Sequence, residues 1–230
     1  MKRLILFDID GTLLSTDGAA GRAFETAMID VYGTAGPIGE VSFAGKTDPQ
    51  IAYELLSRAG LDRGRIEEGL PRLWNGYLEC FVAELARTPV RVFPGVMAFL
   101  DLVEGHGAET ITGLLTGNIE EGARRKLEAA GIGFERFKVG AFGSDHEDRN
   151  ELPAVAMARA EAITGLRFEG KEMAIVGDTP ADIICGDVVG ARTVAVATGV
   201  FSREELAACE PDFLFDSLED ADLVWEAIVS

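Results

Sequence analysis

The sequence predicts an α/β protein with a doubly wound, mainly parallel, Rossmann-like core sheet and an inserted helical cap. Three observations support this prediction. Apolar strand-like runs alternate with helical patterns through most of the 230 residues, which is typical of βαβ units. Several of these runs show little polar alternation, as expected for strands that are buried on both faces. One long stretch breaks the alternation with helical patterns alone.

The core elements follow one another in a regular order. Strands are expected at residues 4–9, 110–116, 137–142, 173–176, 193–197 and 213–215. Core helices are expected between them at residues 96–104, 119–130, 152–163, 181–189, 203–208 and 218–228. Gly131, Gly165 and Gly190 follow three of these helices, where a C-terminal cap is expected.

The stretch 15–89 contains the helical patterns that interrupt this order. They lie near residues 20–32, 49–60 and 66–85, and no convincing strand accompanies them. We interpret the stretch as a helical cap inserted just after the first strand. Residues 1–14 and 90–230 then form the α/β core, and the chain is long enough for both parts.

Composition excludes several classes of function. A net charge of −18 argues against binding to nucleic acids or acidic membranes, because both attract basic surfaces. No run approaches the roughly 20 apolar residues of a membrane span. The three cysteines are widely spaced and form no metal-binding pattern, so a reducing, cytoplasmic location is expected. Monomer and dimer are equally compatible with the sequence.

Two carboxylates at the end of the first strand point to metal-assisted chemistry. Asp8 and Asp10 are spaced i and i+2, so a strand would direct both to the same side. Two acids held that close repel each other unless a cation neutralises them or one takes a proton. Oxygen ligands of this kind suit Mg²⁺, which is therefore the expected cofactor.

Four motifs in order resemble those of the haloacid dehalogenase (HAD) superfamily. Residues 8–12, Asp-Ile-Asp-Gly-Thr, resemble its D-x-D-G-T signature. Residues 114–118 are similar to the second motif, an apolar strand that ends in a hydroxyl, and residues 175–182 to the fourth, an acidic pair after a strand. The third motif is usually a Lys-Pro at a helix start, which this chain lacks; Arg149 is its best candidate, whereas Lys126 and Lys171 are set aside.

The resemblance implies roles for the acidic residues. Asp8 is expected to be the nucleophile that forms an aspartyl-phosphate, and Asp10 the general acid and base. Mg²⁺ would be held by Asp8, Asp178 and the backbone carbonyl of Asp10. Asp182 is expected to lie behind the metal ligand Asp178 or to contact the metal through a water molecule. Thr12 is expected to support the turn.

The resemblance also implies a phosphate-binding set. Thr116 would donate its hydroxyl, Gly117 and Asn118 their backbone N–H groups, and Arg149 its positive charge. A plain alternative for Asn118 is that its side chain caps the next helix. In the cap, Arg22 and Lys46 could face a second anionic group of the substrate, or could simply be surface cations.

The function that these residues favour is Mg²⁺-dependent hydrolysis of a small phosphorylated metabolite, as in phosphoglycolate phosphatase-like members. A sugar phosphomutase resembling β-phosphoglucomutase is the main alternative, because it would use the same core residues. A phospholigand-binding protein without catalysis is a third possibility. Asp10 argues against dehalogenation, because dehalogenases of the superfamily lack an acid at that position.

Overall fold

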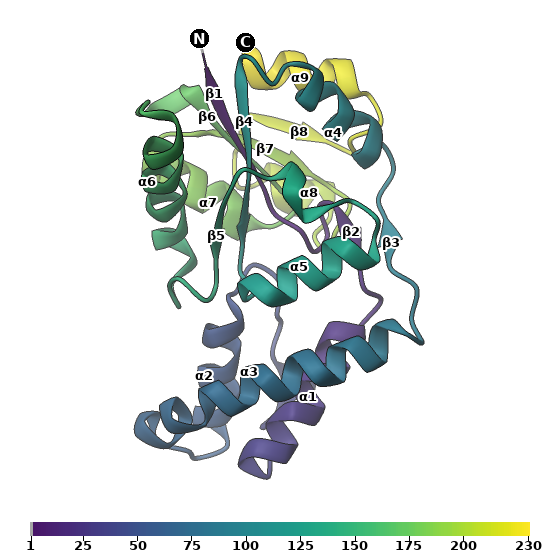
Figure 1. The fold of residues 1–230 in the computed structure, drawn as a ribbon, viewed down its shortest axis with the longest axis vertical. Coiled ribbons are helices and arrows are strands. Elements are labelled where there is room, and N and C mark those ends of the chain that lie inside the picture. Colours follow the sequence, from purple (N-terminus) through teal and green to yellow (C-terminus); the bar gives the residue numbers. More distant parts are fainter. Residues whose placement is uncertain (1) are drawn as a thin grey trace.

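The computed structural model describes residues 2–230 and contains a six-stranded parallel sheet with the order β5-β4-β1-β6-β7-β8 (Figure 1). Its chain order reverses on either side of β1, which is the doubly wound arrangement predicted from the sequence. The strands are β1 (Arg3–Phe7), β4 (Thr110–Thr116), β5 (Val139–Phe142), β6 (Met173–Gly177), β7 (Arg192–Val196) and β8 (Phe213–Phe215).

Strand β1 divides its side chains between two apolar layers. Ile5 and Phe7 pack into one layer, and Leu4 and Leu6 into the other, and all four are almost completely buried. This even division explains the unbroken apolar run in the sequence. The first layer is covered by α4 (Val96–Gly105), α5 (Glu120–Ala129) and α9 (Ala221–Val229), and the second by α6 (Leu152–Thr164) and α7 (Pro180–Val189).

The remaining core elements are short. Helix α8 (Arg203–Ala207) packs Leu206 against the sheet near β7 and β8. The 3-10 turns of the core are η2 (Phe134–Arg136), η3 (Arg149–Glu151) and η4 (Gly170–Glu172). Gly165 and Gly190 end α6 and α7 in the left-handed conformation, with φ of 70° and 68°, so two of the three predicted caps are confirmed. Gly131, with φ of 68°, follows the C-cap residue Ala130 of α5.

Three helices form a separate lobe below the sheet, drawn in purple and blue in Figure 1. They are α1 (Ala19–Tyr32), α2 (Asp48–Arg58) and α3 (Arg63–Leu85), with the 3-10 turn η1 (Ile38–Glu40) between the first two. Their apolar faces share a core of their own that includes Phe24, Met28, Leu55, Leu73 and Phe81. The three helical patterns expected between residues 15 and 89 are therefore present.

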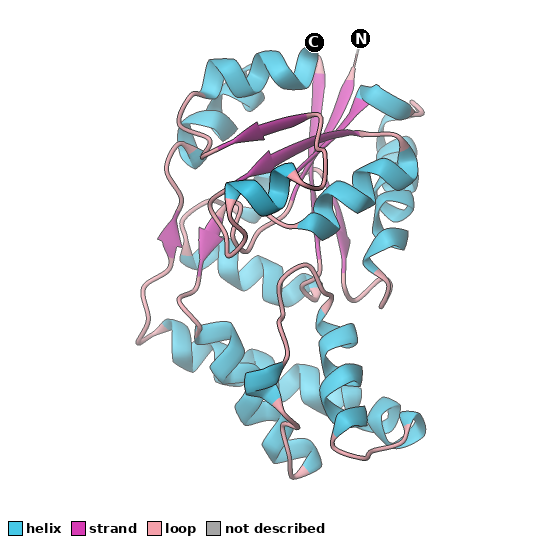
Figure 2. Ribbon diagram, turned by 180° about the vertical axis from the view of Figure 1, so that it is seen from behind, coloured by secondary structure: helices cyan, strands magenta, loops and turns pink. Residues whose placement is uncertain are grey.

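Two chain segments join this lobe to the sheet. They pair as an antiparallel ribbon of two residues each, β2 (Leu14–Ser15) and β3 (Arg91–Val92), visible in Figure 2. The sequence did not predict this ribbon, because two residues are too short for a periodic pattern. No helix within residues 2–230 is long and apolar enough to cross a membrane.

The register of the sheet brings the predicted motifs to one edge. Phe7 of β1 pairs with Leu114 of β4 on one side and with Val176 of β6 on the other. The residues that follow these strands, Asp8 and Asp178, therefore emerge beside Thr116 at the carboxyl ends of the sheet. The helical lobe lies against this same edge (Figure 1).

Candidate active site

A cavity of about 450 Å³ lies between the carboxyl edge of the sheet and the helical lobe. Asp8, Asp10, Thr116, Arg149 and Asp178 line its core side. Four motifs that are far apart in the sequence thus meet in one cavity, as the strand assignments predicted. A concave site at the switch point of a parallel sheet is the expected place for a ligand.

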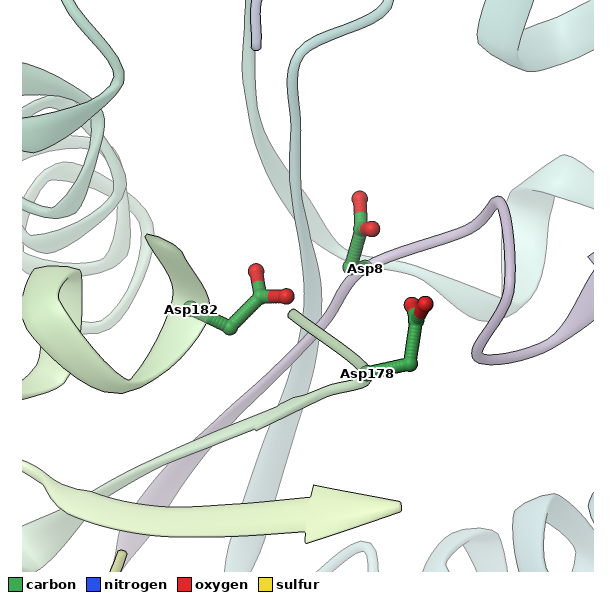
Figure 3. Close-up of side chains that lie close together, drawn as sticks. All are labelled: Asp8, Asp178 and Asp182. Atoms are coloured by element: carbon green, nitrogen blue, oxygen red, sulfur yellow. The ribbon is translucent and has the colours of Figure 1, made fainter. Parts of the chain in front are cut away.

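Three buried carboxylates lie close together at this edge of the sheet (Figure 3). Asp8, Asp178 and Asp182 each place one oxygen within 4.8 Å of the other two. Burial, together with the charges of Asp182 and Asp10, raises the pKa of Asp8 to about 6, although Arg149 opposes the shift. Burial and the carboxylates of Asp8 and Asp182 raise the pKa of Asp178 well above its ordinary value. The acids therefore crowd one another and favour an added positive charge.

The carboxylate of Asp178 is tightly enclosed. A Cβ atom at Gly199 would lie 1.7 Å from Asp178 Oδ2, and one at Gly11 would lie 2.1 Å from the same oxygen. Gly11 also has a φ of +86°, which side chains rarely adopt. Thr12 donates its hydroxyl to Asp178 Oδ1 at 2.8 Å. The Gly-Thr of the first motif therefore holds the acid of the fourth motif in place.

These residues fit a divalent cation. Asp8 and Asp178 offer hard oxygen ligands close together, and one bonded hydroxyl fixes Asp178 while leaving its second oxygen in the enclosed space. Carboxylate and carbonyl oxygens are the donors that Mg²⁺ prefers. Burial, and after it the neighbouring carboxylates, raises the pKa of Asp8 and of Asp178, so a cation beside them would favour their ionised forms.

Arg149 lies in the turn η3 just before α6 and is 5 % exposed. Its Nη2 is 3.2 Å from Asp8 Oδ1 and 2.5 Å from Asp182 Oδ1. Burial alone would lower the pKa of Arg149, but the carboxylates of Asp182 and Asp8 raise it above its ordinary value. The structure thus brings a permanent cation to Asp8, where the third motif would be expected.

Asp182 supports this arginine rather than facing the cavity. Its Oδ2 accepts hydrogen bonds from the Thr179 N–H at 3.0 Å and from the Thr179 hydroxyl at 2.7 Å, in a capping box at the start of α7. Both oxygens of Asp182 are therefore engaged, one by the helix terminus and one by Arg149.

A second polar cluster surrounds Asp10. Asn118 Nδ2 donates to Asp10 Oδ2 at 2.8 Å and to the Thr116 hydroxyl at 2.7 Å. Lys126 Nζ donates to the same Asp10 oxygen at 2.6 Å and to Asn118 Oδ1 at 2.6 Å. The side chain of Asn118 does not cap the following helix; it links the first and second motifs instead.

Lys126, which the sequence interpretation set aside as the third-motif cation, nevertheless belongs to this cluster. It is only 4 % exposed and lines the cavity from α5. A signal was present, because Lys126 falls among the buried helix positions Ala123 and Leu127, where a lysine is rare unless it is paired. Lys171, also set aside, lies elsewhere and pairs with Asp212 at 2.6 Å.

The cap candidates differ in position. Lys46 lines the cavity and forms an ion pair with Glu54 of α2. Arg22 is outside the lining and binds Glu84 of α3 at 2.7 Å.

Asp48, which the sequence interpretation did not single out, connects the lobe to the core. Its Oδ2 accepts the Ile119 N–H at 2.8 Å, where α5 begins, and its own N–H donates to the Gly117 carbonyl at 2.7 Å. Burial raises the pKa of Asp48 to about 6, although Lys126 opposes the shift. A carboxylate of the helical lobe therefore accepts the backbone N–H of the residue that precedes a core helix.

Comparisons with known proteins agree with this geometry. A family model described as HAD-hydrolase-like matches residues 153–221. The probable phosphatase IndB of Dickeya dadantii is 26% identical over 222 residues, which are 96% of this chain and 92% of the relative. The phosphoglycolate phosphatase of Rhodospirillum rubrum is 26% identical over 220 residues, or 94% and 88% of the two chains.

The chain is similar to HAD-like phosphatases over almost its whole length. Its fold is also that of a β-phosphoglucomutase from Clostridium difficile, with a TM-score of 0.74, 15% identity, and coverage of 100% of this chain and 98% of the other. This last likeness concerns the fold alone. The resemblance expected from four short motifs is thus confirmed over almost the whole length of two relatives.

Proposed function

We propose that this HAD-like phosphatase hydrolyses a small phosphate monoester through an aspartyl-phosphate on Asp8, with Mg²⁺ as cofactor. The observation that carries the proposal is the meeting of Asp8, Arg149 and Asp178 at the bottom of one cavity. The relatives named phosphatases support the same class of reaction.

The proposed first step transfers the phosphoryl group to the enzyme. An oxygen of Asp8 attacks phosphorus, the bond between phosphorus and the alcohol oxygen breaks, and Asp10 gives its proton to the leaving alcohol. Arg149, 3.2 Å from Asp8, keeps positive charge beside the nucleophile. Mg²⁺, held by Asp8, Asp178 and the Asp10 carbonyl, would neutralise charge between the nucleophile and the phosphoryl group.

The second step releases phosphate. Water gives a proton to Asp10 as its oxygen attacks phosphorus, the bond to Asp8 breaks, and inorganic phosphate leaves. Thr116 and the backbone N–H groups of Gly117 and Asn118 are proposed to bind the phosphate oxygens throughout. Asn118 and Lys126 hold the Asp10 carboxylate that both steps require.

Two further proposals concern the division of the chain into cap and core and the location of the protein. We propose that residues 15–89 act as a cap and that residues 1–14 and 90–230 form the catalytic core, in keeping with the separate apolar core of the helical lobe. We also propose a cytoplasmic location, since Cys80, Cys185 and Cys209 are free thiols.

The test is phosphate release from a panel of small monoesters, with Mg²⁺ and with a chelator, and with Asp8→Asn as the inactive variant. We expect metal-dependent release that Asp8→Asn lowers by at least about 10³-fold. Full activity of Asp8→Asn would overturn the nucleophile assignment. An isomerised sugar phosphate in place of free phosphate would instead identify a mutase.

A further inference from the structure

The side of the cavity formed by the helical lobe carries a group of apolar and aromatic side chains. They are Phe24 of α1, Phe43 of the loop before α2, Ile51 of α2 and Tyr77 of α3. Phe24 packs edge-to-face on Phe43 and on Tyr77, with ring centroids 6.1 and 5.5 Å apart. Three of these side chains are less than 5 % exposed, so they form a fixed wall and not a set of loose surface groups.

The cations that line the cavity already have acidic partners. Lys46 pairs with Glu54, and Lys126 with Asp10. Arg149 pairs with Asp8 and Asp182 at the phosphate end. The remaining one, Arg91, lies over the ring of Phe93 and 3.5 Å from Asp17.

This charge balance disfavours a second anion on the substrate. The lobe adds a carboxylate to the cavity, Asp48, whose pKa is raised to about 6. A carboxylate on the leaving alcohol, if placed against these aromatic rings, would therefore have to compete with acids that already pair with the lining cations. Burying an unpaired charge is costly, whereas an apolar group gains free energy in the same place.

An exposed apolar side chain also lines the cavity. It is Val200, in the loop after β7, which is 78 % exposed. The volume of about 450 Å³ falls within the ~300–1,000 Å³ of sites that enclose ligands larger than a phosphate ion. An alcohol with an apolar body would fill this space and cover Val200.

We propose that the preferred substrate is the phosphate monoester of an uncharged, largely apolar alcohol, and not a phosphorylated carboxylic acid. This proposal rests on the proposed phosphatase function and specifies its substrate class. Phe24, Phe43, Ile51 and Tyr77 would contact the alcohol, and the pairing of Lys46 with Glu54 would exclude a second anion. Selectivity then comes from the lobe, while the core residues act on the phosphoryl group.

Three alkyl esters test the proposal directly. Ethyl phosphate, 2-phenylethyl phosphate and 2-phosphoglycolate share a primary alcohol and differ in what it carries. We expect kcat/KM for 2-phenylethyl phosphate to exceed that for ethyl phosphate by about 10–100-fold, in line with the selectivity of apolar pockets. 2-Phosphoglycolate should be the poorest of the three.

Two matched variants test the charge argument. Glu54→Gln releases Lys46 and should raise kcat/KM for 2-phosphoglycolate at least about fivefold relative to 2-phenylethyl phosphate. Glu84→Gln releases Arg22 in the same lobe but outside the cavity, and should leave that ratio unchanged. Phe43→Ala should lower the ratio of 2-phenylethyl to ethyl phosphate turnover. This variant tests the substrate proposal independently if Glu54→Gln folds poorly.

The outcomes separate this inference from the proposed function. Phosphate release that is fastest with 2-phosphoglycolate would overturn the substrate class while leaving the phosphatase intact. An unchanged ester ratio in Phe43→Ala would do the same. Release from none of the three esters, nor from an activated aryl phosphate, would instead contradict the phosphatase proposal itself.

Discussion

Lys126 Nζ lies 2.6 Å from Asp10 Oδ2, and the lysine is 4 % exposed although the Asp10 side chain is 42 % exposed. The carboxylate is thus held from its buried side and left open toward the cavity. An acid–base residue must be oriented in both proposed half-reactions, so this buried contact gives Lys126 a positioning role.

Lys126→Met should lower kcat by about 10²-fold on an alkyl phosphate, the low end of what a general acid contributes. The loss should be smaller on an aryl phosphate, whose leaving group needs less protonation. Steady-state kinetics on the two esters measure this difference. Lys138→Met, which removes an exposed lysine bonded only to the Glu135 carbonyl, should leave both rates unchanged. Equal losses on both esters in Lys126→Met would argue against a role through Asp10.

Metal binding should be visible without turnover. Saturation at 100 times Kd adds about 2.7 kcal/mol to the free energy of unfolding, or roughly 5–10 °C in Tm for a chain of this size. We expect Mg²⁺ to raise the Tm of the wild type by this amount. Asp178→Asn should abolish the response and should itself be more stable in chelator, because one repelling buried acid is gone.

The matched control is Asp187→Asn, an exposed acid on α7. It should keep the full Mg²⁺ response. If Asp178→Asn were stabilised by Mg²⁺ as much as the wild type, the cation would have to bind elsewhere.

A methyl group at Gly199 should disrupt the site without removing any polar group. Its Cβ would lie 1.7 Å from Asp178 Oδ2, so the carboxylate must move. We expect Gly199→Ala to weaken Mg²⁺ activation by at least about tenfold, as expected when a ligating group is displaced. Gly105→Ala, at an exposed position with nothing within 4 Å, serves as the control and should change nothing. Titration of activity against Mg²⁺ concentration provides the measurement.

Asp48 should make stability depend on pH. Its pKa is about 6 in the folded protein against an ordinary value of 3.8, so the folded state binds more protons between these two values. Stability contributed by this group is then greatest at low pH and decreases as pH rises from about 4 to 6. The pKa values of Asp8 and Asp178 are also raised. The contribution of Asp48 is therefore measured by comparing the wild type with Asp48→Asn. We expect Tm to fall less between pH 4.5 and 7 in Asp48→Asn than in the wild type, by thermal unfolding in chelator. Parallel pH profiles of Tm would refute this origin.

The residues that meet at the carboxyl edge of the sheet could be predicted, because each of them lies at the end of a predicted strand. Asp8, Thr116 and Asp178 follow apolar runs, and parallel strands bring their carboxyl ends together. Arg149 could be predicted as a cation before a helix. Its ion pair with Asp182 could not, because the two residues are 33 positions apart and no periodic pattern indicates that contact.

The lobe side of the site was harder to predict for a different reason. Lys46 lines the cavity, one of two positions that the sequence left open, but its ion pair with Glu54 depends on how a loop folds back on α2. Lys126 was missed because a lysine in a helix is ordinarily at the surface, and its acidic partner is 116 residues away. Long-range pairing of charges leaves little trace in a single sequence.

The two hydrogen bonds between Asp48 and the segment before α5 have a consequence for the cooperativity of unfolding. A hydrogen bond contributes about 1 kcal/mol to stability, and here one partner in each bond belongs to the helical lobe. If the lobe melted first, the Ile119 N–H would lose its acceptor and the Thr116–Asn118 segment would lose the hydrogen bond between Gly117 and Asp48. The stability of the lobe and that of the core therefore depend on each other, which favours a single unfolding transition over two separate ones.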